Sequence, residues 1–225
     1  MIIPCCGGFN MTTSTLKDKV YSSVLLDIIN GEYTVDSIIS EKALAEKLQV
    51  SKAPVREALV ALCSNGILQS VPRQGYTIVK YTDKNLHDIL EYRIMLECGC
   101  LARSFDHITP TQLLRLDSIV RSEFIYLPAG DPRDYLGCTL NFHLTLASYA
   151  ENEYVYNQLD DALNTSMRAY LQLYWKEWKE HAEIKPSSLH LQIVEAIRVK
   201  DKKGALELLK DDITTLLSTS NHQFS

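Results

Sequence analysis

Four polar side chains fall on stripes that are otherwise apolar, and their types could bind a metal ion or an anion. Arg93 follows an apolar repeat by seven residues, and His143, His190 and Asp212 each lie within a similar repeat on a later segment. An apolar repeat at helical spacing faces a core, so we expect all four side chains to point inward. Two histidines and an aspartate suit Zn²⁺, Ni²⁺, Mn²⁺ or Fe²⁺, and the planar fork of an arginine matches a carboxylate.

Burying such groups costs free energy unless they pair with one another, with a metal or with a ligand. One interpretation is a ligand pocket, since convergent polar groups inside an apolar bundle are typical of one. The alternative is a buried hydrogen-bond network, for instance Arg93 with Asp212 and the histidines with backbone carbonyls. A salt bridge from Arg93 to Glu97, one helical turn away, is a further alternative. We favour the pocket because four segments contribute to it.

Helices are predicted to position these side chains. From Thr82 onward the sequence has no convincing strand pattern, little glycine and several apolar repeats separated by short breaks. Asp83 is the expected N-cap of the first helix. An antiparallel helical bundle follows from this pattern. The predicted helices cover residues 83–105, 110–127, 132–150, 152–178, 186–199 and 201–219.

The segment that begins at Ser40 predicts two short helices joined by a tight turn. Ser40 is the N-cap of the first helix, and Ser51 caps the second, which starts near Lys52. Pro54 is tolerated there because the first turn of a helix needs no amide hydrogen. The apolar stripe of the second helix leaves its N-terminal residues exposed. In a helix-turn-helix protein this end enters the major groove, where an arginine such as Arg56 can pair with guanine.

Two alternating runs, residues 67–71 and 76–79, predict a β-hairpin directly after these helices. Its tip carries Arg73 and Gly75, and a glycine lets the backbone approach a phosphate or the minor groove. The hairpin is therefore a wing. The predicted fold is mainly α, with an N-terminal winged helix-turn-helix and a C-terminal antiparallel α-helical bundle.

The length of 225 residues suits two modest domains. We predict a DNA-binding domain over residues 15–82 and an all-α effector-binding and dimerisation domain over residues 83–225, after an N-terminal tail, 1–14, that is expected to be disordered. The net charge of −5 comes from the second domain, because the first is close to neutral. Individual basic side chains must therefore provide the attraction to phosphates.

The remaining composition is consistent with a cytoplasmic protein. No secretory signal or membrane-spanning stretch is visible. The cysteines lack metal-finger spacing and are expected to be reduced, packed thiols. They are Cys5, Cys6, Cys63, Cys98, Cys100 and Cys138.

The first domain resembles the winged helix of the GntR family of bacterial transcription regulators. The likeness lies in Glu41-Lys-Ala-Leu-Ala, in Val50-Ser-Lys-Ala-Pro-Val-Arg-Glu-Ala-Leu59 and in Pro72-Arg-Gln-Gly75. Lys52 replaces the arginine most common at its position, and its ammonium lacks the planar fork with which arginine reads a base through two parallel hydrogen bonds. By this resemblance the DNA-contact positions are Lys42, Ser51, Lys52, Ala53, Arg56 and Gly75.

The second domain resembles the FCD-type effector domain of the FadR branch of that family. The likeness lies in Tyr92-Arg-Ile-Met-Leu-Glu97, in Asn141-Phe-His-Leu-Thr-Leu-Ala147 and in His190-Leu-Gln-Ile-Val-Glu-Ala-Ile197. Many members of the branch bind a divalent metal through one aspartate and three histidines and hold a small carboxylate effector with it. The effector contacts implied here are Arg93, Thr139, His143 and His190.

The metal ligands implied by this resemblance are His143, His190 and Asp212. Two positions depart from the family pattern, because Thr139 stands where the aspartate is expected and Asp212 where the third histidine is expected. The set still has a facial arrangement of ligands. The alternative is a pocket that has lost the metal and binds its effector through Arg93 and hydrogen bonds.

These features predict a homodimeric regulator, most often a repressor in this family, that binds a palindromic operator in double-stranded DNA and responds to a small carboxylate. Two-fold symmetry requires two half-sites. One alternative is a metal-dependent hydrolase built on His143, His190 and Asp212, although no paired general base is evident. A second is a constitutive DNA-binding protein with no effector response.

Overall fold

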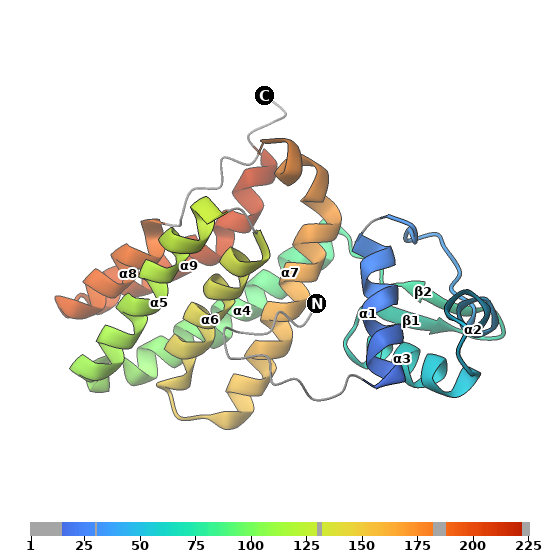
Figure 1. The fold of residues 1–225 in the computed structure, drawn as a ribbon. Helices are drawn as coiled ribbons and strands as arrows, with labels where there is room; N and C mark the ends of the chain where they lie inside the picture. Colours follow the sequence, from blue (N-terminus) through green and yellow to red (C-terminus); the bar gives the residue numbers. More distant parts are fainter. Residues whose placement is uncertain (1–14, 30, 130–131, 182–187, 222–225) are drawn as a thin grey trace. The chain divides into compact units, whose positions relative to one another are not determined.

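The computed structural model describes residues 15–29, 31–129, 132–181 and 188–221, and it divides into two units (Figure 1). The first unit ends at Tyr81 and the second begins at Thr82. The described part of the first unit contains helices and a β-hairpin, and that of the second contains helices alone. The predicted fold class is therefore confirmed, whereas the N-terminal tail, Cys5 and Cys6 lie outside the described residues.

Three helices form the core of the first unit: α1 (Leu16–Ile29), α2 (Glu41–Leu48) and α3 (Lys52–Ser64). The sequence analysis did not predict α1. Its Val20 and Val24, one turn apart, are fully buried, and α1 packs on α3. Burial of an apolar stripe is what stabilises a helix of this length.

The turn between α2 and α3 has the local structure that its residues favour. The hydroxyl of Ser40 accepts a hydrogen bond from the amide of Ala43, as expected of an N-cap. Gln49 ends α2 in the left-handed region, with φ 54°. Ser51 occupies the N-cap position of α3, but its side chain makes no capping hydrogen bond, which corrects the prediction.

The wing consists of β1 (Leu68–Val71) and β2 (Gly75–Ile78), paired antiparallel with Leu68 opposite Ile78. Arg73, in the connecting turn, has φ 64°. Ile39 and Tyr76 exchange two backbone hydrogen bonds of 2.7 and 3.0 Å. Because Ile39 directly precedes Ser40, these bonds fix the wing to the start of α2.

The second unit is a helical bundle whose predicted helix ends agree with the structure to within three residues. Helix α4 packs against α6, α7 and α9, and α5 packs against α6 and α8. Among the described residues there is no candidate membrane-spanning helix. The helices are α4 (Asp83–Ser104), α5 (Pro110–Ala129), α6 (Pro132–Ser148), α7 (Glu153–His181), α8 (Ser188–Arg198) and α9 (Lys202–Asn221), with a short 3₁₀ helix over Phe105–His107.

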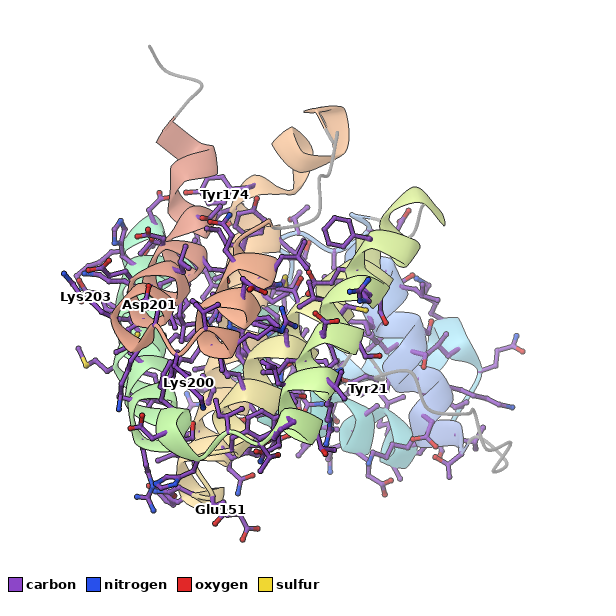
Figure 2. All side chains as sticks on the ribbon, turned by 90° about the vertical axis from the view of Figure 1, so that its left-hand side faces the viewer. Tyr21, Glu151, Tyr174, Lys200, Asp201 and Lys203 are labelled. Atoms are coloured by element: carbon purple, nitrogen blue, oxygen red, sulfur yellow. The ribbon has the colours of Figure 1, made fainter. Side chains whose placement is uncertain are left out.

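The helix ends of this unit are set by local chemistry. Thr82, and not Asp83 as predicted, is the N-cap of α4, because it forms a reciprocal capping box with Asn85. Glu151 and Lys200 adopt left-handed φ values of 52° and 62°. Figure 2 shows them at the turns that join α6 to α7 and α8 to α9. Such residues reverse the chain and bring α8 against α9.

Candidate functional site

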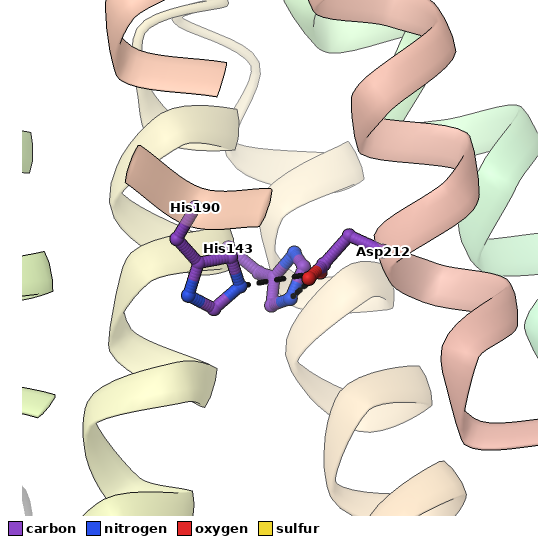
Figure 3. Close-up of side chains that lie close together, drawn as sticks. All are labelled: His143, His190 and Asp212. Carbon is purple, nitrogen blue, oxygen red and sulfur yellow. Dashed lines mark hydrogen bonds and ion pairs between the residues drawn. The ribbon is translucent and has the colours of Figure 1, made fainter. Parts of the chain in front are cut away.

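The four side chains predicted to point inward are all buried in the bundle. Arg93 on α4 is 3% exposed, His143 on α6 is 2% and His190 on α8 is 0%. The side chain of Asp212, on α9, is 8% exposed. Figure 3 shows both imidazoles turned toward Asp212. One potential ligand atom from each histidine and from Asp212 lies within 4.8 Å of the others.

Asp212 lies between the two histidines. Nε2 of His143 and Nε2 of His190 each lie 3.2 Å from the same carboxylate oxygen, Oδ2. Helix α9 supplies the aspartate, and α6 and α8 supply one histidine each. Three helices therefore bring two imidazole nitrogens and a carboxylate oxygen together, as a metal-binding set requires.

A glutamate fixes the far side of each imidazole. Nδ1 of His143 hydrogen-bonds Oε2 of Glu97 on α4 at 2.6 Å. Nδ1 of His190 lies 2.9 Å from both carboxylate oxygens of Glu123 on α5. Phe142 stacks on the ring of His190, with 4.1 Å between centroids. These contacts fix which nitrogen of each ring faces Asp212, the role that carboxylates have beside metal-bound histidines.

Glu97 also pairs with Arg93. Nε of Arg93 donates to Oε1 of Glu97 at 2.9 Å, which is the salt bridge considered from the sequence. Nη1 of Arg93 donates to the hydroxyl of Ser166 on α7 at 3.3 Å. The cluster is therefore a buried hydrogen-bond network, as the second interpretation expected, but its histidines bond carboxylates instead of backbone carbonyls.

Burial and charge act in opposite directions on this cluster. Burial alone would lower the pKa of His190, but Asp212 and Glu123 outweigh it and raise the pKa to about 10. The pKa of His143 is also raised, because Glu97 and Asp212 outweigh its burial. Burial would raise the pKa of Asp212, yet the two imidazoles hold it well below its ordinary range. With both rings protonated, three cations face three carboxylates.

These shifts predict how the stability of the metal-free protein depends on pH. Raised histidine pKa values stabilise the fold below the ordinary value of 6.5, and this contribution is lost as the pH rises toward about 10. Lowered carboxylate pKa values stabilise it above the ordinary value of 3.8 for Asp212, and this is lost on acidification. We expect the urea midpoint in EDTA to be highest between about pH 5 and 6.5. A midpoint that rises from pH 6 to pH 9 would contradict this assignment.

Thr139 lies on α6, one turn before His143, where the family pattern has an aspartate. Its hydroxyl is buried and has no hydrogen-bond partner among the described residues. A buried hydroxyl without a partner costs free energy. Of the four predicted effector contacts, Thr139 is the one whose side chain makes no hydrogen bond among the described residues.

The predicted DNA-contact residues lie together in the first unit. Ser51, Lys52, Ala53 and Arg56 are exposed on the first two turns of α3 and its N-cap. Lys42 on α2 and Arg73 at the wing tip are also exposed.

Gly75 has a structural role that the sequence analysis missed. A Cβ at this position would lie 2.5 Å from the carbonyl oxygen of Ile39, and its φ is 134°. The bridge between Ile39 and Tyr76 therefore requires a glycine even without DNA.

Two glutamates of the functional regions were not singled out from the sequence. Glu123 follows Leu116 and Val120 on one helical stripe, so the periodicity that marked the histidines could have identified it. Glu41 bonds Arg56, but it is separated from Arg56 by 15 positions and lies on another helix. No spacing rule within one helix reveals such a contact.

Two family descriptions together match most of the chain. The model described as "FCD domain" matches residues 88–215, and the one described as "Bacterial regulatory proteins, gntR family" matches residues 16–78.

Individual proteins are similar over most of the chain. The HTH-type transcriptional repressor RspR of Escherichia coli (strain K12) is 23% identical over 193 residues, which cover 84% of this chain and 82% of that protein. The gluconate operon transcriptional repressor of Bacillus subtilis (strain 168) is 23% identical over 195 residues, 85% of this chain and 79% of that protein. The solved structure of E. coli McbR/YncC has a TM-score of 0.65 at 22% identity and covers 94% of this chain and 99% of that chain, a likeness of fold.

Proposed function

The chain belongs to the GntR family of bacterial regulators and carries an FCD domain, and we propose that it is a dimeric repressor whose operator affinity responds to a small carboxylate. Family membership makes it a DNA-binding transcriptional regulator and not an enzyme, so the hydrolase considered from the sequence is wrong. RspR of Escherichia coli and the gluconate operon regulator of Bacillus subtilis are both named as repressors, which supports repression here. A regulator of this kind acts in the cytoplasm, beside the chromosome.

The exposed end of α3 supports the proposed reading of DNA. Lys52, Ala53 and Arg56 are presented to the major groove, while Ser51, Lys42 and Arg73 contact phosphates or the adjacent groove. Two copies related by a two-fold axis bind two half-sites of a palindrome.

The buried cluster is the observation that carries the proposed effector response. The cluster fits a divalent metal, because His143, His190 and Asp212 would supply two imidazole nitrogens and a carboxylate oxygen. Carboxylates already orient both rings, and the hydroxyl of Thr139 lacks a partner among the described residues. A bound Zn²⁺, Ni²⁺, Mn²⁺ or Fe²⁺ would supply open coordination positions for the oxygens of a carboxylate.

Arg93 is the proposed cationic contact of the effector. Its guanidinium is held by Glu97, and the same glutamate holds His143. A carboxylate that binds Arg93 competes with Glu97 and so changes a contact shared by α4 and α6. The ligand shifts operator binding only if it prefers one arrangement of the helices over the other. A metal-free pocket centred on Arg93 is the second form of this proposal.

Operator selection followed by a ligand panel tests this function. The full-length wild-type protein is used to enrich duplexes from a random pool, and we expect an inverted repeat. Small carboxylates, with gluconate included because a relative is named for the gluconate operon, are then titrated. We expect one to change operator affinity by about five-fold or more.

Two results would count against the proposed function. Failure of the wild type to enrich any sequence would contradict sequence-specific DNA binding. An operator affinity that no carboxylate changes, with or without added divalent metal, would support the constitutive alternative.

A further inference from the structure

The carboxylate of Glu41 forms a bidentate ion pair with Arg56, the arginine of the proposed recognition helix. Nε of Arg56 donates to Oε1 and Oε2 of Glu41 at 3.0 and 3.2 Å, and Nη2 donates to Oε2 at 2.8 Å. Glu41 is the first residue of α2, and its side chain is 23% exposed. The hydroxyl of Tyr76, on the wing, donates to the same carboxylate at 3.1 Å. One glutamate thus links α2, α3 and the wing.

The contact uses one edge of the guanidinium and leaves another open. Nε and Nη2 form the side edge, which Glu41 occupies. Nη1 and the second hydrogen of Nη2 form the end edge, and Nη1 makes no hydrogen bond within the described residues. The Arg56 side chain is 66% exposed, so water reaches this end edge. An end edge of this kind can donate two parallel hydrogen bonds to O6 and N7 of guanine.

The glutamate is held in its charged form. Hydrogen bonds from Arg56 and then Tyr76 lower the pKa of Glu41 against the opposing effect of burial. A carboxylate beside the DNA-reading end of α3 repels phosphates and restricts the rotation of Arg56. Non-specific binding is mostly attraction to phosphates, so such a charge weakens it.

We propose that Glu41 is a specificity-determining positioning residue, which fixes Arg56 so that its end edge reads a guanine and which disfavours non-specific DNA. This inference rests on the proposed function. Glu41 acts through Arg56, and Tyr76 orients Glu41 from the wing.

The test compares full-length Glu41→Gln with wild type on two duplexes: the duplex selected by the wild type and a scrambled duplex of the same composition. Affinity for the selected duplex is expected to fall and affinity for the scrambled duplex to rise. The ratio of the two should drop about tenfold. Tyr76→Phe should shift the ratio in the same direction by less. In an Arg56→Ala background, Glu41→Gln should leave the ratio unchanged.

Glu57→Gln is the matched control. Glu57 is exposed on α3, next to Arg56 in sequence, and forms no hydrogen bond or ion pair among the described residues. The variant removes the same charge as Glu41→Gln, so it should raise the affinities for both duplexes alike and leave their ratio unchanged.

Several outcomes would overturn the proposal. An unchanged affinity ratio in both Glu41→Gln and Tyr76→Phe would overturn it. A fall in the affinity of Glu41→Gln for both duplexes that persists in the Arg56→Ala background would also overturn it, because such a fall marks a purely structural role. The proposal is also overturned if replacement of the guanines in the selected duplex by 7-deazaguanine leaves the affinity unchanged, because the end edge would then bind phosphate. In all of these outcomes the wild type still prefers the selected duplex, so the proposed function stands. A wild type that prefers neither duplex would contradict both the proposed function and this inference.

Discussion

Arg56→Ala is expected to weaken binding to the selected operator by about 5- to 150-fold, or about 1–3 kcal/mol. Arg56 is the exposed arginine of α3, the proposed recognition helix, and its end edge is open. Loss of a charge-assisted hydrogen-bond pair to a base accounts for a change of this size. Fluorescence anisotropy with a labelled duplex, at one fixed salt concentration, measures it.

Lys19→Ala is the control for loss of a positive charge in the same unit. Lys19 is exposed on α1, outside the predicted DNA-contact set. It should change operator affinity by less than about threefold. Equal affinities for wild type and Arg56→Ala would show that the recognition helix is misassigned.

His190→Ala is expected to destabilise the bundle by about 3–5 kcal/mol, because it leaves buried carboxylates without their partner. His190 is fully buried, and its two nitrogens bond Glu123 and Asp212. Both tryptophans of the chain, Trp175 and Trp178, lie in α7, so tryptophan fluorescence reports the unfolding of this unit alone. Urea titration of the EDTA-treated protein at about pH 6 measures the change.

His87→Ala is its control. His87 is exposed on α4, and its removal should change the free energy of unfolding by less than about 0.5 kcal/mol. Similar midpoints for the two variants would contradict the arrangement of charges around His190.

The periodicity of the sequence was sufficient to predict the inward direction of Arg93, His143 and His190. This succeeds because a helix on an apolar core has one buried face, and any residue on that face is buried with it. Ser40 was predicted correctly as an N-cap for a similar reason, since capping depends on a few adjacent atoms. Thr82 was missed in favour of Asp83 because both are good caps, and only the reciprocal bond with Asn85 selects between them.

Contacts between elements could not be predicted in the same way. The bond from Arg56 to Glu41 depends on the angle between α2 and α3, and the need for glycine at position 75 depends on the approach of Ile39. Whether Arg93 pairs with Glu97 or with Asp212 likewise depends on how α4 and α9 pack. A single sequence leaves these distances open.

Whether the buried cluster holds a metal is decided most directly by elemental analysis of untagged protein, with wild type beside His143→Ala and His87→Ala. After supplementation with divalent metals, we expect about one ion per chain in wild type and in His87→Ala and none in His143→Ala. Wild-type protein that carries no metal after supplementation would contradict a metal site at His143, His190 and Asp212 and leave a metal-free pocket centred on Arg93.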